Sequence, residues 1–496
     1  MSLLDVRDRA IDAAAPVRYG RVGRMVGLRV EVDGLQAALG EGVRIMPEGG
    51  PPVDGEVVSV DGKSLACMPY GELSGVRFGT PVEALGTPLR ISVGENLMGR
   101  VLDGLGRPLD GRALPEGLEE VGLQAESPHP LDRRLIDRQL PLGIRVIDTL
   151  VPCGRGQRLG IFSGSGVGKS SLLSMVARGT EADVSVLALV GERGREVNEF
   201  LVNDLGEEGL ARSVVVVATS DEPALVRIRA AFTATRIAEW FRDQGRDVVL
   251  MMDSLTRFAM AQREVGLSAG EPPATRGYPP SVFSLLARLL ERAGCDDEGS
   301  ITGLYTVLVE ADDMNEPIAD AARSLLDGHL VLSRRLATSG HFPSVDVLES
   351  ISRLEPMITT AEGRQAATEL RKLLAAMRDA KDLVEIGAYV RGTNPSVDRA
   401  LGMSDFIEAF LRQDLHEISP AEESWACLQA LMATDLPPAA SGVDPAAPGG
   451  GGMGGGTGVG MGSGQGGGTV NGGSGGFSGP ATWAGAQALG ATGASI

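Results

Sequence analysis

The chain has 496 residues, of which 43% are apolar, 22% charged and 4% aromatic, and its formal net charge is −19. This length allows roughly three domains of about 150 residues each, and the negative charge disfavours a protein that coats nucleic acid, because phosphate backbones repel it. Four cysteines without a CxxC pair and only four histidines argue against a disulfide framework or a zinc cluster, and they fit a reducing cytosol.

The N-terminal segment is the first predicted element. Apolar side chains recur at helical spacing within residues 1–14, with charged residues between them, which predicts a short amphipathic helix. Two interpretations stay open, a frayed terminal helix and a helix that docks a partner. Its charges stand where a secretion signal needs an apolar stretch, and no run of about 20 strongly apolar residues is present that could span a bilayer.

Residues 16–93 have an all-β pattern. Short strand-like runs are separated by Gly, Pro and Asp-Gly turns, and the clearest run, over 26–32, alternates apolar and polar side chains. Further strands are expected over 55–60 and 81–84. Short strands at this spacing are typical of a small barrel, and the segment carries no obvious chemistry.

Residues 94–360 change to an α/β pattern. Near-continuous apolar runs of strand length favour parallel strands that are covered on both faces. These runs lie at 159–162, 184–190, 214–218, 248–252 and 304–309. A helix is predicted between Pro280 and Gly294, where apolar residues recur every three or four positions. The combination predicts an open, mostly parallel sheet with crossover helices.

The remaining segments are helical and then glycine-rich. Residues 361–437 carry a stripe of apolar side chains at helical spacing. The stripe consists of Leu370, Leu373, Leu374, Met377 and Val384. Residues 438–496 are rich in glycine and nearly uncharged, so they cannot bury enough apolar surface to offset the entropy of ordering. This segment is predicted to be a flexible tail.

The strongest functional signal is a glycine-rich loop between a predicted strand and a predicted helix. Its residues are Ser163, Gly164, Ser165, Gly166, Val167, Gly168, Lys169, Ser170 and Ser171. Glycines let the backbone curl so that N–H groups point at phosphate oxygens, and the positive end of the following helix adds to the attraction. Lys169 should bridge the β- and γ-phosphates and Ser170 should ligate Mg²⁺. Ser163 stands where the strict motif has glycine, and a small residue there is compatible with the loop.

Two acidic residues follow apolar runs of the same predicted sheet. Asp253 ends one run, which places a carboxylate at the sheet edge where the metal of a phosphate-loop enzyme needs an acidic anchor. Glu192 is the first acid beyond another run, and it is the candidate to orient and deprotonate water in line with the γ-phosphate. Arg193 beside it could hold phosphate oxygens, although a solvated charge run at a strand end is the plainer interpretation of the local pattern.

Several motifs together resemble the catalytic subunits of rotary ATP synthases and their relatives. They are residues 163–170, 191–196, 253–258 and 343–353. Other stretches look like the type III secretion branch of that superfamily, and within it the chain looks most like the flagellar protein-export ATPases. These stretches are residues 271–283, 312–317 and 326–329. The resemblance covers residues from about 16 to 435 and leaves out the glycine-rich tail.

The resemblance implies a Mg²⁺-dependent ATPase whose core is a RecA-like phosphate-loop domain. Glu192 is then the general base, Arg193 and Arg257 approach the γ-phosphate, and Asp253 is the acid on the Mg²⁺ side. The implied organisation has a docking helix, a small β-barrel, the RecA-like core, a helical domain and a disordered tail. These parts are expected over 1–15, 16–93, 94–360, 361–437 and 438–496.

The resemblance also implies that a second subunit completes the site. Arg353 would be an arginine finger that reaches into the neighbouring subunit's site, because the charge on the transferred phosphoryl group needs a cation from outside the loop. An isolated monomer should then hydrolyse ATP poorly, and head-to-tail contacts should close into a hexameric ring. Phe342 falls where the family stacks an aromatic ring on adenine, and Phe410 is expected to help close that pocket.

Partners and location follow from the same resemblance. Besides the ring itself, it implies a stator-like regulator at the N-terminal helix, a small coiled-coil central-stalk protein, export-gate membrane proteins, and export chaperones with their cargo. Nucleic acid is not expected as a partner. The expected location is the cytoplasm, at the inner face of the cytoplasmic membrane.

Individual sequence features distinguish the export ATPase from alternative functions. An acid at Glu192 favours hydrolysis over a non-catalytic nucleotide-binding subunit, because glutamine could orient water but could not accept its proton. The proline-rich segment 271–280 favours export over an ion-driven ATP synthase. A ring-shaped RNA translocase ranks low, because its front domain should be basic and aromatic. A scaffold for chaperone–cargo complexes could coexist with ATPase activity, and flagellar and injectisome export share one core.

Overall fold

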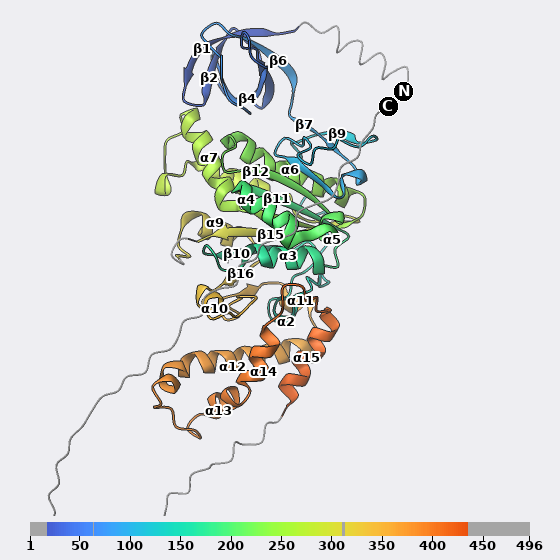
Figure 1. Cartoon of the computed structure of the whole chain (residues 1–496), viewed down its shortest axis with the longest axis vertical. Helices are drawn as coiled ribbons and strands as arrows, with labels where there is room; N and C mark the ends of the chain where they lie inside the picture. Colours follow the sequence, from blue (N-terminus) through green and yellow to red (C-terminus); the bar gives the residue numbers. More distant parts are fainter. Residues whose placement is uncertain (1–16, 63, 310–312, 435–496) are drawn as a thin grey trace, which may run out of the picture. The chain divides into compact units, whose positions relative to one another are not determined.

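The computed structural model describes residues 17–62, 64–309 and 313–434 (Figure 1). The predicted docking helix over 1–15 and the predicted tail over 438–496 lie outside the described residues. No helix within the described ranges is long and apolar enough to cross a membrane. All four cysteines are described and none forms a disulfide.

The N-terminal strands close into a barrel in the order β1-β2-β5-β4-β3-β6. Their bounds are β1 (Tyr19–Val26), β2 (Arg29–Asp33), β3 (Glu41–Ile45), β4 (Val53–Asp61), β5 (Ser64–Pro69) and β6 (Pro81–Pro88). The strands predicted over 55–60 and 81–84 are confirmed within β4 and β6. The single strand predicted over 26–32 is wrong, because Gly27 adopts a φ of 58° and turns the chain between β1 and β2.

The barrel strands end before the predicted boundary at residue 93. β7 (Arg90–Val93) pairs instead with β9 (Glu119–Gly122) in a separate antiparallel sheet. Between them lie the short helix η1 (Glu95–Leu97) and β8 (Arg100–Asp103), and β8 joins the edge of the central sheet. The chain therefore enters the α/β region through an edge strand.

The central sheet has the order β17-β16-β10-β15-β13-β11-β12-β8, with β14 paired to β15. The bounds of its further strands are β10 (Arg158–Ser163), β11 (Val184–Glu192), β12 (Ser213–Thr219), β13 (Asp247–Asp253), β14 (Gly294–Cys295), β15 (Ser300–Leu308), β16 (Gly328–Leu332) and β17 (Ile351–Ser352). The strands are parallel except for β14 and β17, which pair antiparallel to their neighbours. The predicted mostly parallel sheet is confirmed, and β15 separates the strand before the glycine-rich loop from the strand that ends in Asp253.

Helices cover both faces of this sheet because successive strand residues point to opposite sides. In β11, Val186 and Ala188 pack in one core with helix α6, whereas Leu187 packs in a second core with helix α3. The helices and helical turns of this region are α2 (Arg145–Leu150), α3 (Lys169–Gly179), α4 (Gly194–Glu199), η2 (Phe200–Leu205), α5 (Gly206–Ala211), α6 (Ala224–Asp243), α7 (Leu255–Ala269), η3 (Thr275–Gly277), α8 (Pro280–Leu290), α9 (Pro317–Leu325) and α10 (Arg334–Thr338). The helix predicted from Pro280 is confirmed as α8.

A helical region follows the sheet. Its helices are α11 (Glu355–Ile358), α12 (Ala361–Glu385), α13 (Pro395–Gly402), α14 (Ser404–Leu411) and α15 (Ala421–Ala433). Leu370 and Leu373 of the predicted stripe are buried in the same core as Ile147 of α2. Val384 is 37% exposed, so the buried stripe stops short of the end of α12.

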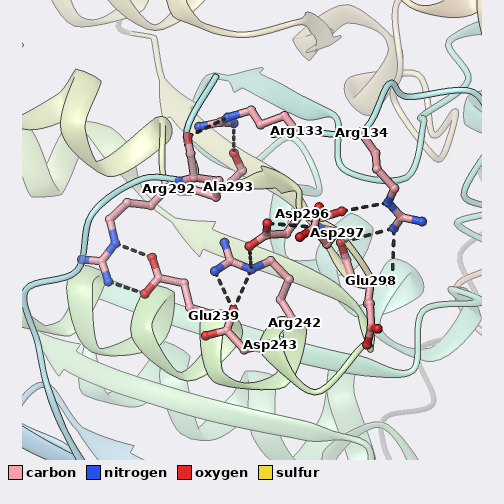
Figure 2. Close-up of polar contacts among 12 residues, drawn as sticks. Arg133, Arg134, Glu239, Arg242, Asp243, Arg292, Ala293, Asp296, Asp297 and Glu298 are labelled. Carbon is pink, nitrogen blue, oxygen red and sulfur yellow. Dashed lines mark hydrogen bonds and ion pairs between the residues drawn. The ribbon is translucent and has the colours of Figure 1, made fainter. Parts of the chain in front are cut away.

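The amino ends of the central strands are tied by arginine–carboxylate pairs (Figure 2). Arg292 donates to both carboxylate oxygens of Glu239 at 2.6 Å, and the two side chains are 4% and 1% exposed. Arg242 pairs with Asp243 at 2.7 Å and with Asp296 at 3.3 Å. These ion pairs hold α6, α8 and the loop before β15 together.

Candidate functional site

The glycine-rich loop lies where it was predicted, between β10 and α3 at the carboxyl edge of the central sheet. Gly166 and Gly168 adopt φ values of 76° and 91°, a left-handed conformation that other residues rarely adopt. Ser163 is buried at the end of β10, and its hydroxyl has no hydrogen-bond partner in the described part of the chain. The loop therefore accommodates serine at the position where the strict motif has glycine.

Lys169 lies between the two predicted acidic residues. Its Nζ donates to Asp253 and lies 3.5 Å from Glu192 Oε1. Burial by itself lowers the pKa of Lys169, but the charges of Asp253 and Glu192 outweigh burial and hold that pKa above its ordinary value. The three side chains from α3, β11 and β13 are thus brought together, as the sequence predicted, and the lysine is charged.

Glu192 lies in a partly desolvated position at the end of β11. Burial raises the pKa of its carboxyl, Asp253 raises it further, and Lys169 and Arg257 act in the opposite direction. A carboxylate whose pKa lies above the ordinary value is a better proton acceptor near neutral pH. The environment of Glu192 therefore suits a general base.

The backbone before Glu192 is shaped for a close neighbour. Gly191 has a φ of 72°, and a Cβ built on it would lie 3.0 Å from the Cβ of Arg257. Sequence reasoning did not single out Gly191 for this role, although it is the residue directly before the predicted base. A side chain at Gly191 would be strained by its φ and would crowd the side chain of Arg257.

The two arginines predicted near the γ-phosphate differ in surroundings. Arg257 stands in the first turn of α7, and its buried Nε has no hydrogen-bond partner among the residues that the structure describes. Arg193 is 74% exposed and donates to Glu196 at 2.7 Å. Arg257 therefore offers an unused donor beside Glu192, whereas Arg193 is directed to Glu196.

Thr306 is a neighbour of the site that sequence reasoning missed. It lies in β15 and is fully buried, and its hydroxyl donates to Asp253 Oδ1 at 2.7 Å. A threonine within an apolar strand gives no local signal of function. Its contact with Asp253 follows from the order of the strands in the sheet, which could not be read from the sequence.

A cavity beside the loop contains the predicted adenine-stacking residue. Its volume is about 620 Å³, and Gly168, Ser171, Phe342 and Gln413 are among the residues that line it. Phe342 is 45% exposed, and its ring lies close enough to Gly168 that a Cβ there would lie 3.3 Å from it. The Ser344 hydroxyl donates to the Val167 carbonyl at 2.6 Å and ties the Phe342 segment to the loop.

Phe410 does not line this cavity. It is 4% exposed and lies in the core beneath the Arg145 guanidinium, which is 6.0 Å from the ring centroid. The expectation that Phe410 closes the adenine pocket is therefore not met by its position. Its apolar ring is used to pack α14 against α2.

Arg353 lies at the opposite edge of the sheet from the loop. Its backbone N–H bonds Asp327, which in turn bonds Arg158 at the start of β10. The six residues of β10 separate this edge from the loop by roughly 17 Å at about 3.3 Å per residue. The Arg353 guanidinium donates to the Arg323 carbonyl at 3.3 Å. The Arg353 guanidinium is therefore directed to Arg323 and not to the loop of its own chain.

The donor set at the loop fits Mg²⁺. Ser170 is exposed at the start of α3 and Asp253 presents a carboxylate nearby, and hydroxyl and carboxylate oxygens are ligands for this hard cation. No cluster of three or more His, Cys, Asp or Glu residues that could cage a metal occurs among the residues described. Mg²⁺ commonly uses one or two protein ligands together with substrate phosphates, which matches this arrangement.

Two family descriptions match the chain. Residues 143–352 match the nucleotide-binding domain of the ATP synthase alpha/beta family. Residues 359–430 match the C-terminal domain of the T3SS EscN ATPase. Together the two matches cover the central sheet except β8, and most of the helical region that follows it.

Curated relatives cover most of the chain. A flagellum-specific ATP synthase of Bacillus subtilis is 51% identical, over 84% of this chain and 96% of the relative. A type 3 secretion system ATPase of Xanthomonas euvesicatoria is 49% identical, over 82% of this chain and 92% of the relative.

Solved structures of type III secretion ATPases are also similar to this chain. The assembled ATPase EscN from the type III secretion system of enteropathogenic E. coli is 46% identical, with a TM-score of 0.80 over 84% of this chain and all of that chain. EscN in complex with its central stalk EscO matches with 45% identity and a TM-score of 0.78.

Proposed function

The chain belongs to the ATP synthase alpha/beta family, among its flagellum-specific and type III secretion ATPases, and we propose that it hydrolyses ATP to drive flagellar protein export. The observation that carries this proposal is the convergence of Lys169, Glu192 and Asp253 at the glycine-rich loop. About half of the residues are identical to those of flagellum-specific relatives over most of the chain, which supports the same chemistry and the same process.

Each residue at the loop has a role in the proposed hydrolysis. Lys169 leaves the carboxylates of Asp253 and Glu192 and binds the β- and γ-phosphates instead. The loop N–H groups bind the remaining phosphate oxygens. Glu192 orients the attacking water and accepts its proton. Arg257 offers its unused Nε to the charge that develops on the γ-phosphate. Phe342 stacks on the adenine in the adjoining cavity.

Mg²⁺ is the cofactor that these residues fit. Ser170 and Asp253 would hold it on the protein side, because they are the hydroxyl and carboxylate at this edge of the sheet. When bound, Mg²⁺ neutralises charge on the β- and γ-phosphate oxygens. Asp253 would then serve as a ligand rather than a base, which leaves Glu192 as the acid that accepts the proton.

A ring of subunits is the proposed assembly. Arg353 lies too far from its own loop, so it serves the loop of a neighbouring subunit, and each chain both donates and receives a cation. Head-to-tail contacts of this kind close into a ring when the rotation allows it, and six subunits are the proposed number. The related EscN is an assembled ATPase in its solved structure, which supports the ring.

Partners are proposed on the same basis. A solved structure of EscN contains a central stalk, so a coiled-coil stalk protein is proposed for this chain. A stator-like regulator at residues 1–15, export-gate membrane proteins, and chaperones with their cargo complete the proposed set. The proposed place of action is the cytoplasmic face of the membrane beneath the export gate.

Export of flagellar proteins is tested in the source organism. We expect deletion of the gene to abolish secretion of filament and hook proteins, and a plasmid copy to restore it. A Glu192→Gln copy should fail to restore normal export while the protein accumulates to the same level. Normal flagellar secretion in the deletion strain, with loss of secretion through an injectisome, would assign the chain to the injectisome instead.

A further inference from the structure

Asp253 Oδ1 accepts two hydrogen bonds of different origin. One comes from Lys169 Nζ and the other from the Thr306 hydroxyl at 2.7 Å. Asp253 is 4% exposed and Thr306 is fully buried, so neither bond is shared with bulk solvent. The lysine is the residue that must move to the phosphates, whereas Thr306 belongs to a strand in the middle of the sheet.

The strand order explains why Thr306 occupies this position. β15 lies between β10 and β13, and Thr306 is in register with Ile161 while its neighbour Tyr305 is in register with Met252. The glycine-rich loop follows β10 and Asp253 ends β13. A side chain near the end of β15 is therefore the one that the sheet places between Asp253 and the loop.

We infer that Thr306 is a positioning residue that fixes the Asp253 carboxylate for Mg²⁺ when Lys169 leaves it for the nucleotide. Thr306 keeps Oδ1 occupied, so the second carboxylate oxygen stays available for the metal. This inference rests on the proposed role of Asp253 as the acid on the Mg²⁺ side. Hydrogen-bond partners of metal-ligating carboxylates typically affect metal affinity by about 10- to 100-fold, so the contribution of Thr306 is measurable.

The strand supplies a matched control. Thr302 lies four residues earlier, on the same face of β15, and is equally buried. Its hydroxyl accepts the Gly156 N–H at 2.8 Å, away from the loop. Thr302→Val therefore removes a buried threonine hydroxyl from the same strand without touching Asp253.

The experiment measures ADP binding with and without Mg²⁺ by isothermal titration calorimetry on the full chain. In Thr306→Val the strengthening of ADP binding by Mg²⁺ should fall by roughly tenfold or more, while ADP affinity without Mg²⁺ changes less than about twofold. Thr306→Ser should restore the Mg²⁺ effect, because it keeps the hydroxyl. Thr302→Val should retain the Mg²⁺ effect, whatever its thermal stability.

Asp253→Asn distinguishes a failure of the proposed role of Thr306 from a failure of the proposed metal site. Loss of the Mg²⁺ effect in Asp253→Asn but not in Thr306→Val would overturn the role of Thr306 and leave that of Asp253 intact. An unchanged Mg²⁺ effect in Asp253→Asn would contradict the proposed metal site itself. If Thr306→Val does not fold, Thr306→Ala replaces it, and a normal Mg²⁺ effect in that variant overturns the inference equally.

Discussion

At the amino edge of the central sheet arginines meet carboxylates in fixed pairs, whereas at the carboxyl edge two carboxylates share one lysine. Arg292 and Glu239 form two bonds of 2.6 Å to each other and are almost fully buried. Lys169 instead divides its contacts between Asp253 and Glu192. The Arg292 guanidinium is matched to a single carboxylate by two bonds, whereas the single Lys169 ammonium is divided between two carboxylates.

This difference distinguishes charged groups that stabilise the fold, at the amino edge, from charged groups that are arranged to bind a ligand, at the carboxyl edge. A buried pair with both partners satisfied contributes to one fixed arrangement, and removal of either partner leaves an uncompensated charge. An excess of carboxylates around one lysine, with a neighbouring arginine whose Nε is unused, leaves room for a polyanion and its metal. Arg353, like Arg134, is an exception to this pairing at the amino edge, because its guanidinium reaches a carbonyl oxygen rather than a carboxylate.

The largest expected effect concerns this exception. Arg353→Ala should lower the rate of ATP hydrolysis by about 10³-fold or more, because an arginine finger stabilises the charge of the transition state. Phosphate release by the purified variant at several protein concentrations measures it. Mixing the variant with Lys169→Ala chains should restore part of the activity. At some interfaces the normal loop of an Arg353→Ala chain then lies beside the normal Arg353 of a Lys169→Ala chain. An inactive mixture would contradict a site shared between subunits.

The next effect concerns the carboxyl edge. Glu192→Gln should lower hydrolysis by about 10²- to 10³-fold, because glutamine cannot accept the proton of water. ATP binding, followed by equilibrium titration, should stay within a few-fold of the wild-type chain. Glu199→Gln is the matched control, since Glu199 is an exposed acid of the following helix α4 that pairs with Arg195. Near-normal turnover in Glu192→Gln would remove this residue from the mechanism.

The fixed pair at the amino edge should instead affect stability. Glu239→Gln should lower the free energy of unfolding by about 3–5 kcal/mol, because Arg292 remains buried without its counter-charge. Urea unfolding measures this loss. Glu264→Gln, which breaks the more exposed pair with Arg227, should lower it by less than about 1 kcal/mol. Equal losses in the two variants would show that burial does not distinguish the pairs.

Asp148 gives a smaller effect that depends on pH. Burial raises the pKa of Asp148 to about 7, although its carboxylate accepts backbone N–H groups of Leu142, Gly143 and Ile144. An unfolded chain has an Asp pKa of about 3.9. The folded chain therefore holds this proton more tightly, and the resulting stability is present at low pH and is lost as pH rises through 7.

Thermal unfolding between pH 5.5 and 7.5 measures this dependence. Relative to Asp148→Asn, which does not titrate, the midpoint of the wild-type chain should fall as pH rises toward 7 and should then level off. A difference between the two chains that is constant over this range, or that grows in favour of the wild-type chain, would contradict a raised pKa.

The smallest effect is expected at the C-terminal end. Removal of residues 441–496 should leave the rate of ATP hydrolysis within about twofold, because the loop, the two acids and Arg353 lie outside this segment. Phosphate release under the same conditions compares the shortened and full chains. A large loss would show that the segment contributes to assembly or to the site.

The sequence predicted elements best where one physical signal dominated. Apolar runs located the parallel strands, and the Pro280 start located α8, because burial on both faces and proline chemistry act locally. The strand predicted across Gly27 was wrong, because alternation of side chains continued through a tight turn. β7 has a barrel-like sequence, yet it pairs with β9, and pairing depends on chain topology rather than on local pattern.

The residues expected to contact the nucleotide and the metal could be predicted from the sequence, whereas the residues that surround them could not. The loop, Glu192 and Asp253 carry strong sequence signals because their chemistry requires particular residues at fixed places. Thr306 carries none, because its contact with Asp253 arises from the order of strands across the sheet. Phe410 is the opposite case. It was expected to contact the adenine, but it is buried and packs in the core beside Arg145.

The most direct measurement is a structure of the assembled chain with Mg²⁺ and a non-hydrolysable ATP analogue. We expect Lys169 to have left Asp253 for the phosphates, Glu192 to bond a water behind the γ-phosphate, and Arg353 to enter from the neighbouring subunit. A structure in which Glu192 faces no water and Arg353 lies away from every nucleotide would contradict these expectations.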